Sequence, residues 1–86
     1  MYYVYLIQSL KDGKYYIGQT NDFQKRLKEH NEGKVKSTKH RTPFKLIGYE
    51  EYEKRNEARW REHSLKKSVW KRKKFISDLT TRSPNL

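Results

Sequence analysis

The chain has 86 residues and a formal net charge of +11, which suits one basic domain whose positive field favours polyanions, nucleic acid above all. It contains no cysteine, so a disulfide framework and a cysteine-based zinc site are both excluded. No apolar run approaches the ~18 residues of a spanning helix and no signal segment opens the chain, so we expect a cytoplasmic protein without a membrane partner. Seven Tyr, three Phe and two Trp must supply much of its core.

Two short aromatic and apolar runs, residues 2–7 and 15–20, open the chain. Tyr, Val and Ile suit a pleated, half-buried surface, so both runs predict strands. Asp12-Gly13 between them is a turn signal. The two runs therefore predict a β-hairpin.

A helix is expected directly after the hairpin. Asn21 or Asp22 can cap its start, and Phe23 and Leu27 recur at the i, i+4 spacing of one helix face. Gly33 interrupts this pattern and predicts the end of the helix.

The polar, strongly basic stretch at residues 34–41 predicts an exposed loop. A solvated linker and a phosphate-contacting loop explain it equally well. In the second case Lys36, Lys39 and Arg41 would contact nucleic acid.

A third strand is predicted over residues 44–52, where Gly48 suggests a bulge or the close approach of another backbone. A second long helix should begin with Asn56 as its cap. Trp60, Leu65 and Val69 are the expected buried stripe of that helix. The fold class is therefore α/β in the α+β sense: a small three-stranded, mainly antiparallel sheet flanked by helices.

The C-terminal part is again basic, and from Ser68 it predicts either a continuation of the second helix or a third helix. Its cations form a solvated face or a backbone phosphate surface, with equal weight. We expect one domain over residues 1–79 and a flexible tail over residues 80–86. The candidate nucleic-acid contacts in this part are Lys66, Lys67, Lys71 and Lys74.

Several short motifs occur in an order that resembles the GIY-YIG nuclease superfamily, in its small stand-alone form similar to the N-terminal domain of UvrC. They are Tyr3-Val4-Tyr5, Tyr16-Ile17-Gly18, Arg26, His30-Asn31 and Glu62. The resemblance spans Tyr3 to Lys67. One departure is that Tyr3 replaces the first glycine of the family's first motif.

The resemblance implies a metal-dependent DNA endonuclease. Tyr16 would act as general base or align the attacking water, and Tyr5 would hydrogen-bond nearby. Arg26 would neutralise charge on phosphate, while His30 would hydrogen-bond a tyrosine or the water, or cap the helix end. Glu62 would hold one Mg²⁺ or Mn²⁺ ion, although its spacing alone favours an ion pair with Lys66 at i+4.

No recognition helix or zinc finger is visible, so we expect recognition of DNA shape, branched or single-stranded, in repair or recombination. Two other function classes remain open. One is a non-catalytic basic nucleic-acid-binding module, and the other is a basic protein-interaction domain. The family often joins its catalytic domain to a separate binding domain, which implies a protein partner that supplies specificity here.

Overall fold

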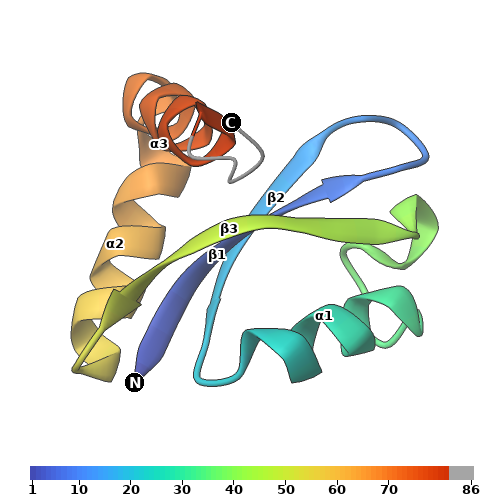
Figure 1. The fold of residues 1–86 in the computed structure, drawn as a ribbon, viewed down its shortest axis with the longest axis horizontal. Helices are drawn as coiled ribbons and strands as arrows, with labels where there is room; N and C mark the ends of the chain where they lie inside the picture. The colour runs from blue at the N-terminus through green and yellow to red at the C-terminus, as the bar shows by residue number, and fades with distance from the viewer. Residues whose placement is uncertain (82–86) are drawn as a thin grey trace.

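The computed structural model describes residues 1–81 and contains one antiparallel sheet. Its strands are β1 (Tyr2–Ser9), β2 (Tyr15–Thr20) and β3 (Phe44–Tyr52), in the order β2-β1-β3 (Figure 1). The central strand β1 pairs antiparallel with both neighbours. The expected fold class and all three expected strands are confirmed.

Helices cover both faces of this sheet. They are α1 (Phe23–Asn31), a short 3-10 turn (Lys39–Arg41), α2 (Arg55–Lys67) and α3 (Val69–Thr81). In Figure 1, α1 lies on one side of the strands, and α2 with α3 lies on the other. One apolar cluster joins β1 to α2 and α3 through Val4, Leu6, Leu65 and Phe75. A second cluster, around Tyr5 and the residues packed beside it, faces α1.

The hairpin turn explains the short connection between β1 and β2. The Ser9 N–H donates to the Lys14 carbonyl at 2.9 Å, and the Ser9 hydroxyl accepts the Lys11 and Asp12 N–H groups at 3.1 Å. Gly13 has a φ of +75°, which a residue with a Cβ adopts only with strain. The turn predicted from Asp-Gly is confirmed.

Helices α1 and α2 are capped in different ways at their N-termini. At α1, Asp22 is the cap, since its carboxylate accepts the Lys25 N–H at 3.1 Å. The expected cap of the second helix, Asn56, is wrong, because α2 begins at Arg55 and its cap is Lys54, two residues earlier. The Glu57 carboxylate accepts the Lys54 N–H at 3.1 Å, so a side chain three residues on satisfies this helix start.

Gly48 sits at the irregularity that its sequence context predicts. Leu6 opposes Gly48, whereas the next residue, Ile7, opposes Leu46, so β3 carries one extra residue at this point. A Cβ on Gly48 would lie 3.1 Å from Cδ2 of Leu79 on α3. The bulge is therefore confirmed, whereas the close neighbour of Gly48 is the Leu79 side chain and not another backbone.

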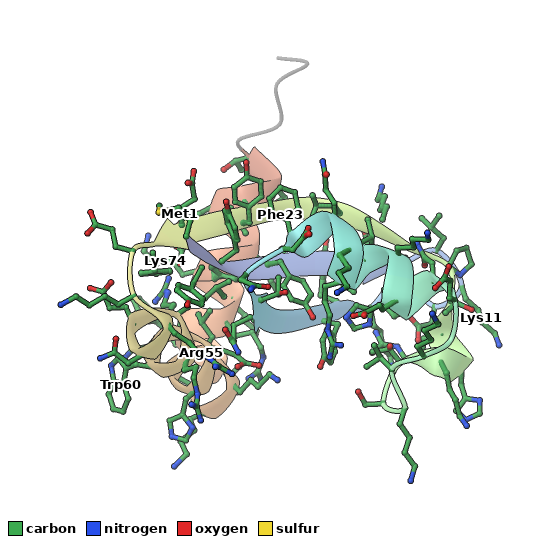
Figure 2. All side chains as sticks on the ribbon, turned by 90° about the horizontal axis from the view of Figure 1, so that it is seen from below. Met1, Lys11, Phe23, Arg55, Trp60 and Lys74 are labelled. Carbon is green, nitrogen blue, oxygen red and sulfur yellow. The ribbon has the colours of Figure 1, made fainter. Side chains whose placement is uncertain are left out.

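The predicted buried stripe of α2 is wrong in two of its three residues. Leu65 is fully buried, but Trp60 is 71% exposed and Val69 is 56% exposed. Ala58 and Leu65, seven residues apart, lie on the face that packs on the sheet, and a residue two positions after Ala58 lies across the helix. Figure 2 shows Trp60 on the outer side of α2, directed away from the sheet.

The chain turns at Ser68, so the basic C-terminal part forms a third helix. The Ser68 hydroxyl accepts the Lys71 N–H at 3.2 Å, and Arg72 donates to the Leu65 and Lys66 carbonyls at 3.2 Å at the end of α2. Helix α3 continues past the predicted domain boundary at residue 79 to Thr81. Residues 82–86 of the predicted tail lie outside the described residues.

Across residues 1–81, each helix is either too short or too polar to cross a lipid bilayer.

Candidate active site

The centre of the site is a close approach between Tyr5 on β1 and Gly18 on β2. The two residues oppose one another across the hairpin, and Tyr5 is only 2% exposed. The phenol ring crosses directly over Gly18, where a methyl group would overlap both the hydroxyl and the ring. Glycine is therefore required at this position by packing.

The Tyr5 hydroxyl begins a buried hydrogen-bonded chain. It lies 2.9 Å from Nε2 of His30, and Nδ1 of His30 lies 2.7 Å from the Thr38 hydroxyl. The Thr38 hydroxyl in turn lies 3.4 Å from the Val35 carbonyl, which can only accept. All partners are satisfied when Tyr5 donates to Nε2, Nδ1–H donates to Thr38 and Thr38 donates to Val35.

Burial determines the protonation states of Tyr5 and His30 in this hydrogen-bonded network. Burial first, and the positive charge of Arg26 second, lower the pKa of His30 to about 4. Burial also raises the pKa of Tyr5 to about 12. At neutral pH both groups are uncharged, so Tyr5 is a hydrogen-bond donor and His30 an imidazole with both nitrogens engaged.

A second group of side chains lies at the β2 edge, next to this chain. The Tyr16 ring is 5.1 Å from the His30 ring between centroids. Nζ of Lys66 lies 5.3 Å from the Tyr16 ring centroid and 2.8 Å from a Glu62 carboxylate oxygen. Lys66 therefore makes the i+4 ion pair with Glu62 that the helical spacing allows, and it also contacts Tyr16 on β2, which the sequence did not predict.

Arg26 lies on α1 and is partly exposed. Its guanidinium is 3.2 Å from the Glu29 carboxylate. Although burial alone would lower it, the pKa of Arg26 is raised by its interactions with the Tyr5 hydroxyl and with Glu29. Arg26 also lines an open groove together with Lys25 and Arg55, so three cations face the same space.

The residues with predicted catalytic roles meet around the Tyr5 hydroxyl. Besides burial, the pKa of Tyr5 responds to Arg26, which lowers it, and to Tyr16 and Glu62, which raise it. Glu62 reaches this set through Lys66, whose ammonium lies over the Tyr16 ring, and the Tyr16 ring centroid lies 6.4 Å from that of Tyr5. Two strands and two helices thus bring together the set that the motifs single out: Tyr5, Tyr16, Arg26, His30 and Glu62.

Glu62 stands as a single carboxylate rather than as part of a metal cluster. Its side chain is 23% exposed, and among residues 1–81 no three side chains of the His, Asp or Glu type come together as a metal site. Mg²⁺ characteristically keeps several waters and takes one or two carboxylates together with substrate phosphate oxygens. One partly exposed carboxylate that lines an open groove fits that donor set.

The predicted nucleic-acid contacts separate into two regions. Lys36 and Lys39 lie exposed after α1, whereas the four C-terminal lysines lie exposed on α2 and α3. Arg41 differs, because its Nε lies 2.9 Å from the Asp12 carboxylate and its guanidinium lies 5.5 Å from the Phe44 ring centroid. Its contacts hold the basic loop against the hairpin turn, which favours a structural role.

Two polar residues contribute to the site in ways that the sequence did not indicate. Thr38 completes the hydrogen bonding of His30, but nothing distinguishes it within a polar loop. Asn31 joins α1 to β3 through two hydrogen bonds. Its Nδ2 donates to the Phe44 carbonyl at 3.0 Å, and its Oδ1 accepts the Phe44 N–H at 2.6 Å. No local signal in the sequence predicts this tertiary contact.

The replacement of the family's first glycine by Tyr3 is accommodated by aromatic packing. The Tyr3 ring lies edge-on to Phe23 at 5.1 Å and to Tyr49 at 5.4 Å between centroids. Phe23 and Tyr49 stack on one another at 4.3 Å. The side chain therefore fills space between α1 and β3 and leaves the Tyr5 contacts intact.

Comparison with known proteins gives the same assignment along nearly the whole chain. A family model described as the GIY-YIG catalytic domain matches residues 1–75. A UPF0213 protein of Clostridium perfringens is 39% identical over 87 residues, which cover 99% of this chain and 92% of that relative. A UPF0213 protein of Halobacterium salinarum is 43% identical over 67 residues, 77% of this chain and 86% of that one.

A solved structure agrees with the fold as well. The solution NMR structure of the UPF0213 protein BH0048 from Bacillus halodurans has 36% sequence identity and a TM-score of 0.56, covering 90% of this chain and 84% of that one. With the motif residues gathered around Tyr5 and the family model matching residues 1–75, the chain belongs to the GIY-YIG nuclease family, among its small UPF0213 members.

Proposed function

We propose that this protein is a metal-dependent endonuclease that hydrolyses DNA phosphodiester bonds and selects its substrate by shape. Membership of the GIY-YIG family supports nuclease chemistry in general. The net charge of +11 supports a polyanionic substrate. A role in repair or recombination, and a protein partner that supplies further specificity, belong to the same proposal.

The observation that carries this proposal is the division of the site into an inward and an outward half. Tyr5 and His30 are buried, and their polar side-chain atoms form hydrogen bonds with one another and with Thr38. Tyr16, Arg26 and Glu62 are partly exposed around them. In the complex that we propose, a phosphate contacts a phenol, a guanidinium and a carboxylate together.

Arg26 is the group that binds and orients the phosphate. A guanidinium presents its donors in a planar fork that matches two phosphate oxygens, and it keeps its charge at every physiological pH. The charge that builds on phosphate during displacement would be stabilised by this preorganised cation. Glu29 holds the guanidinium in place until the substrate takes over part of its hydrogen bonding.

Tyr16 aligns the attacking water, and its own environment favours that role over Tyr5. The pKa of Tyr5 is about 12 and its hydroxyl proton is directed at His30, which makes it a poor base. Tyr16 is partly exposed and lies against the Lys66 ammonium, so an attacking water can reach it. His30, with both ring nitrogens engaged, is a positioning residue that fixes Tyr5.

Glu62 is the residue that would hold Mg²⁺, or Mn²⁺ in its place. When bound, such an ion supplies positive charge to the phosphate oxygens. In the free protein Lys66 is the cationic partner of this carboxylate, so ion binding competes with the 2.8 Å pair. Lys66 then becomes available to a neighbouring phosphate.

The test is a cleavage assay on labelled branched, single-stranded and duplex DNA, with Mg²⁺ or with chelator. We expect metal-dependent nicking by the wild-type protein and its loss in Glu62→Ala and Arg26→Ala. Arg26→Lys should restore little activity, because a single ammonium cannot replace the fork. Glu53→Ala removes an exposed carboxylate away from the site and serves as the matched control. Full metal-dependent cleavage in Glu62→Ala would refute the assignment.

One observation favours a second function, a non-catalytic nucleic-acid-binding module. Glu62 is already paired with Lys66, and no other carboxylate joins it in a metal site among residues 1–81. In that case DNA binding would depend on salt and on the lysines of α3, ignore Mg²⁺, and produce no nicking.

A further inference from the structure

The outer face of α2 carries a tryptophan that the core does not use. Trp60 is 71% exposed, although an indole has a large apolar surface. It lies in an open groove that also reaches the candidate catalytic carboxylate. The groove residues that matter here are Arg59, Trp60, Glu62, His63, Lys66 and Lys67.

The helix itself orders these residues from the site outward. At 3.6 residues per turn, successive residues are about 100° apart around the axis. Glu62 lies nearest the sheet, Lys66 and His63 follow, and Trp60 lies roughly 160° from Glu62. Cations from two further positions, Arg59 and Lys67, flank this path.

The Trp60 ring has a defined orientation despite its exposure. The His63 imidazole, three residues on, lies 6.0 Å from it between centroids with an interplanar angle of 29°. This near-parallel pair presents a flat aromatic surface to solvent at the end of a cationic path. Aromatic surfaces in basic grooves are the usual means of stacking unpaired nucleobases.

The charge of the groove decides between possible occupants. Glu62 is its only acidic side chain among the described groove residues and belongs to the proposed catalytic centre, whereas the others that carry charge are cations. An anionic strand therefore complements it. A base must leave the duplex stack before it can lie on an indole, so the matching strand is single.

We propose that the outer face of α2 is a subsite for single-stranded nucleic acid, in which Trp60 stacks on an unpaired base. This proposal rests on the proposed function in one respect: the strand that reaches Trp60 would continue from the phosphate bound next to Glu62 at the catalytic centre. Lys66 and Lys67 contact the intervening phosphates. The substrate class is thus a strand with unpaired bases beside the cleaved bond, rather than intact duplex.

The chain offers a matched control for this test. Trp70 on α3 is 70% exposed, about as much as Trp60, and lies outside the residues that line the groove. Trp60→Ala and Trp70→Ala thus remove the same side chain at two equally exposed places. Neither change touches the core, so both variants should fold, which thermal unfolding will verify.

Binding is measured with chelator present, so that no cleavage occurs, using three labelled probes. They are a short oligothymidylate, an abasic phosphodiester chain of the same length, and a blunt duplex. We expect Trp60→Ala to weaken oligothymidylate binding by at least about fivefold. It should change binding of the abasic chain and of the duplex by less than about twofold. Trp70→Ala should leave all three unchanged.

Fluorescence gives a second readout. With Trp70→Phe, Trp60 is the sole indole, and its emission should be quenched by oligothymidylate and not by the abasic chain. Equal losses on all three probes in Trp60→Ala would overturn the subsite. So would an unchanged affinity for oligothymidylate, or a response of Trp60 to anionic lipid vesicles alone.

Failure of the subsite and failure of the nuclease proposal are separable. If no DNA is cleaved, but Trp60→Ala selectively weakens oligothymidylate binding, the subsite stands and hydrolysis falls. If Mg²⁺-dependent cleavage is found and the binding of Trp60→Ala is unchanged, the subsite falls and hydrolysis stands. Glu62→Ala should keep the Trp60-dependent affinity, because the stacking surface does not need the carboxylate.

Discussion

The two sides of the candidate site are built in opposite ways. On the α1 side, Tyr5, His30 and Thr38 are almost completely buried, and each polar side-chain atom of these three residues has a hydrogen-bond partner. On the α2 side, Glu62 and Lys66 are partly exposed and paired only with each other, next to an exposed Trp60. Both sides nevertheless face the same tyrosine on β2.

This contrast separates groups that hold the site from groups that meet the substrate. Buried hydrogen-bonded networks are rigid, and a missing partner is costly because the remaining group cannot reach water. Exposed ion pairs contribute little to stability and can exchange their partners for a ligand. Mutations of Tyr5, His30 or Thr38 should therefore act mainly on folding, whereas mutations of Glu62, Lys66 or Trp60 should act mainly on binding or catalysis.

Among the substitutions that disturb the buried network of Tyr5, His30 and Thr38, Gly18→Ala should have the largest effect on stability. The added methyl group would overlap the Tyr5 hydroxyl and ring, so Tyr5 must leave His30. We expect a loss of roughly 3–4 kcal/mol in the free energy of unfolding, from overpacking and a broken buried hydrogen bond. Urea denaturation measures this change.

Gly13→Ala is the matched control for that substitution. A Cβ at Gly13 would meet no atom within 4 Å, but its φ of +75° is strained for alanine. The cost should be about 1 kcal/mol. Equal losses at the two glycines would show that the Tyr5 contact has no special weight.

Acid should weaken the α1 side through His30. Its pKa is 6.5 when unfolded and about 4 when folded, so the unfolded chain binds the proton first as the pH falls. This contribution to stability is complete above about pH 6.5 and decreases as the pH falls toward 4. We expect a loss of about 2–3 kcal/mol across this window, measured by urea denaturation at several pH values.

Two histidine variants test whether that slope belongs to His30. His30→Gln should be less stable at neutral pH and should lose most of the slope. His63→Gln replaces an exposed histidine on α2 and should retain it. A slope that persists in His30→Gln would assign the acid sensitivity to other groups.

Thr38→Val should have a smaller effect on the same side. The substitution keeps the shape of the side chain but leaves Nδ1–H of His30 without its partner at 2.7 Å. An unpaired buried donor costs about 1–2 kcal/mol, which chemical denaturation will report. Thr38→Ser keeps the hydroxyl and should lose clearly less. Equal stability of the wild-type protein and Thr38→Val would show that the His30 tautomer does not depend on Thr38.

The α2 side should show the smallest effect on stability. Glu62→Gln removes an exposed ion pair, so the free energy of unfolding should stay within about 0.5 kcal/mol of the wild-type value. Thermal unfolding at low and high salt checks this expectation. A loss above about 1.5 kcal/mol would mean that the α2 side is also structural, and the contrast between the two sides would disappear.

The sequence by itself determined the strands, the hairpin turn, the first helix and the family. Runs of Tyr, Val and Ile, the Asp-Gly turn and the Asp22 cap are local signals, and each acts within a few residues of the chain. The motif order, through its resemblance to the family, also named Tyr5 and the four residues that meet around it. The glycine at position 18 was part of that motif, although its reason lies across the hairpin.

Only the tertiary structure decided which face of α2 is buried and which partners the loop residues Thr38 and Arg41 have. Which face of α2 is buried depended on the sheet and α3, because both pack on Ala58 and Leu65 and leave Trp60 exposed. Thr38 and Arg41 gained their partners through contacts with α1 and the hairpin turn. Helical spacing tells which residues share a face, but burial is chosen by the elements that pack against that face.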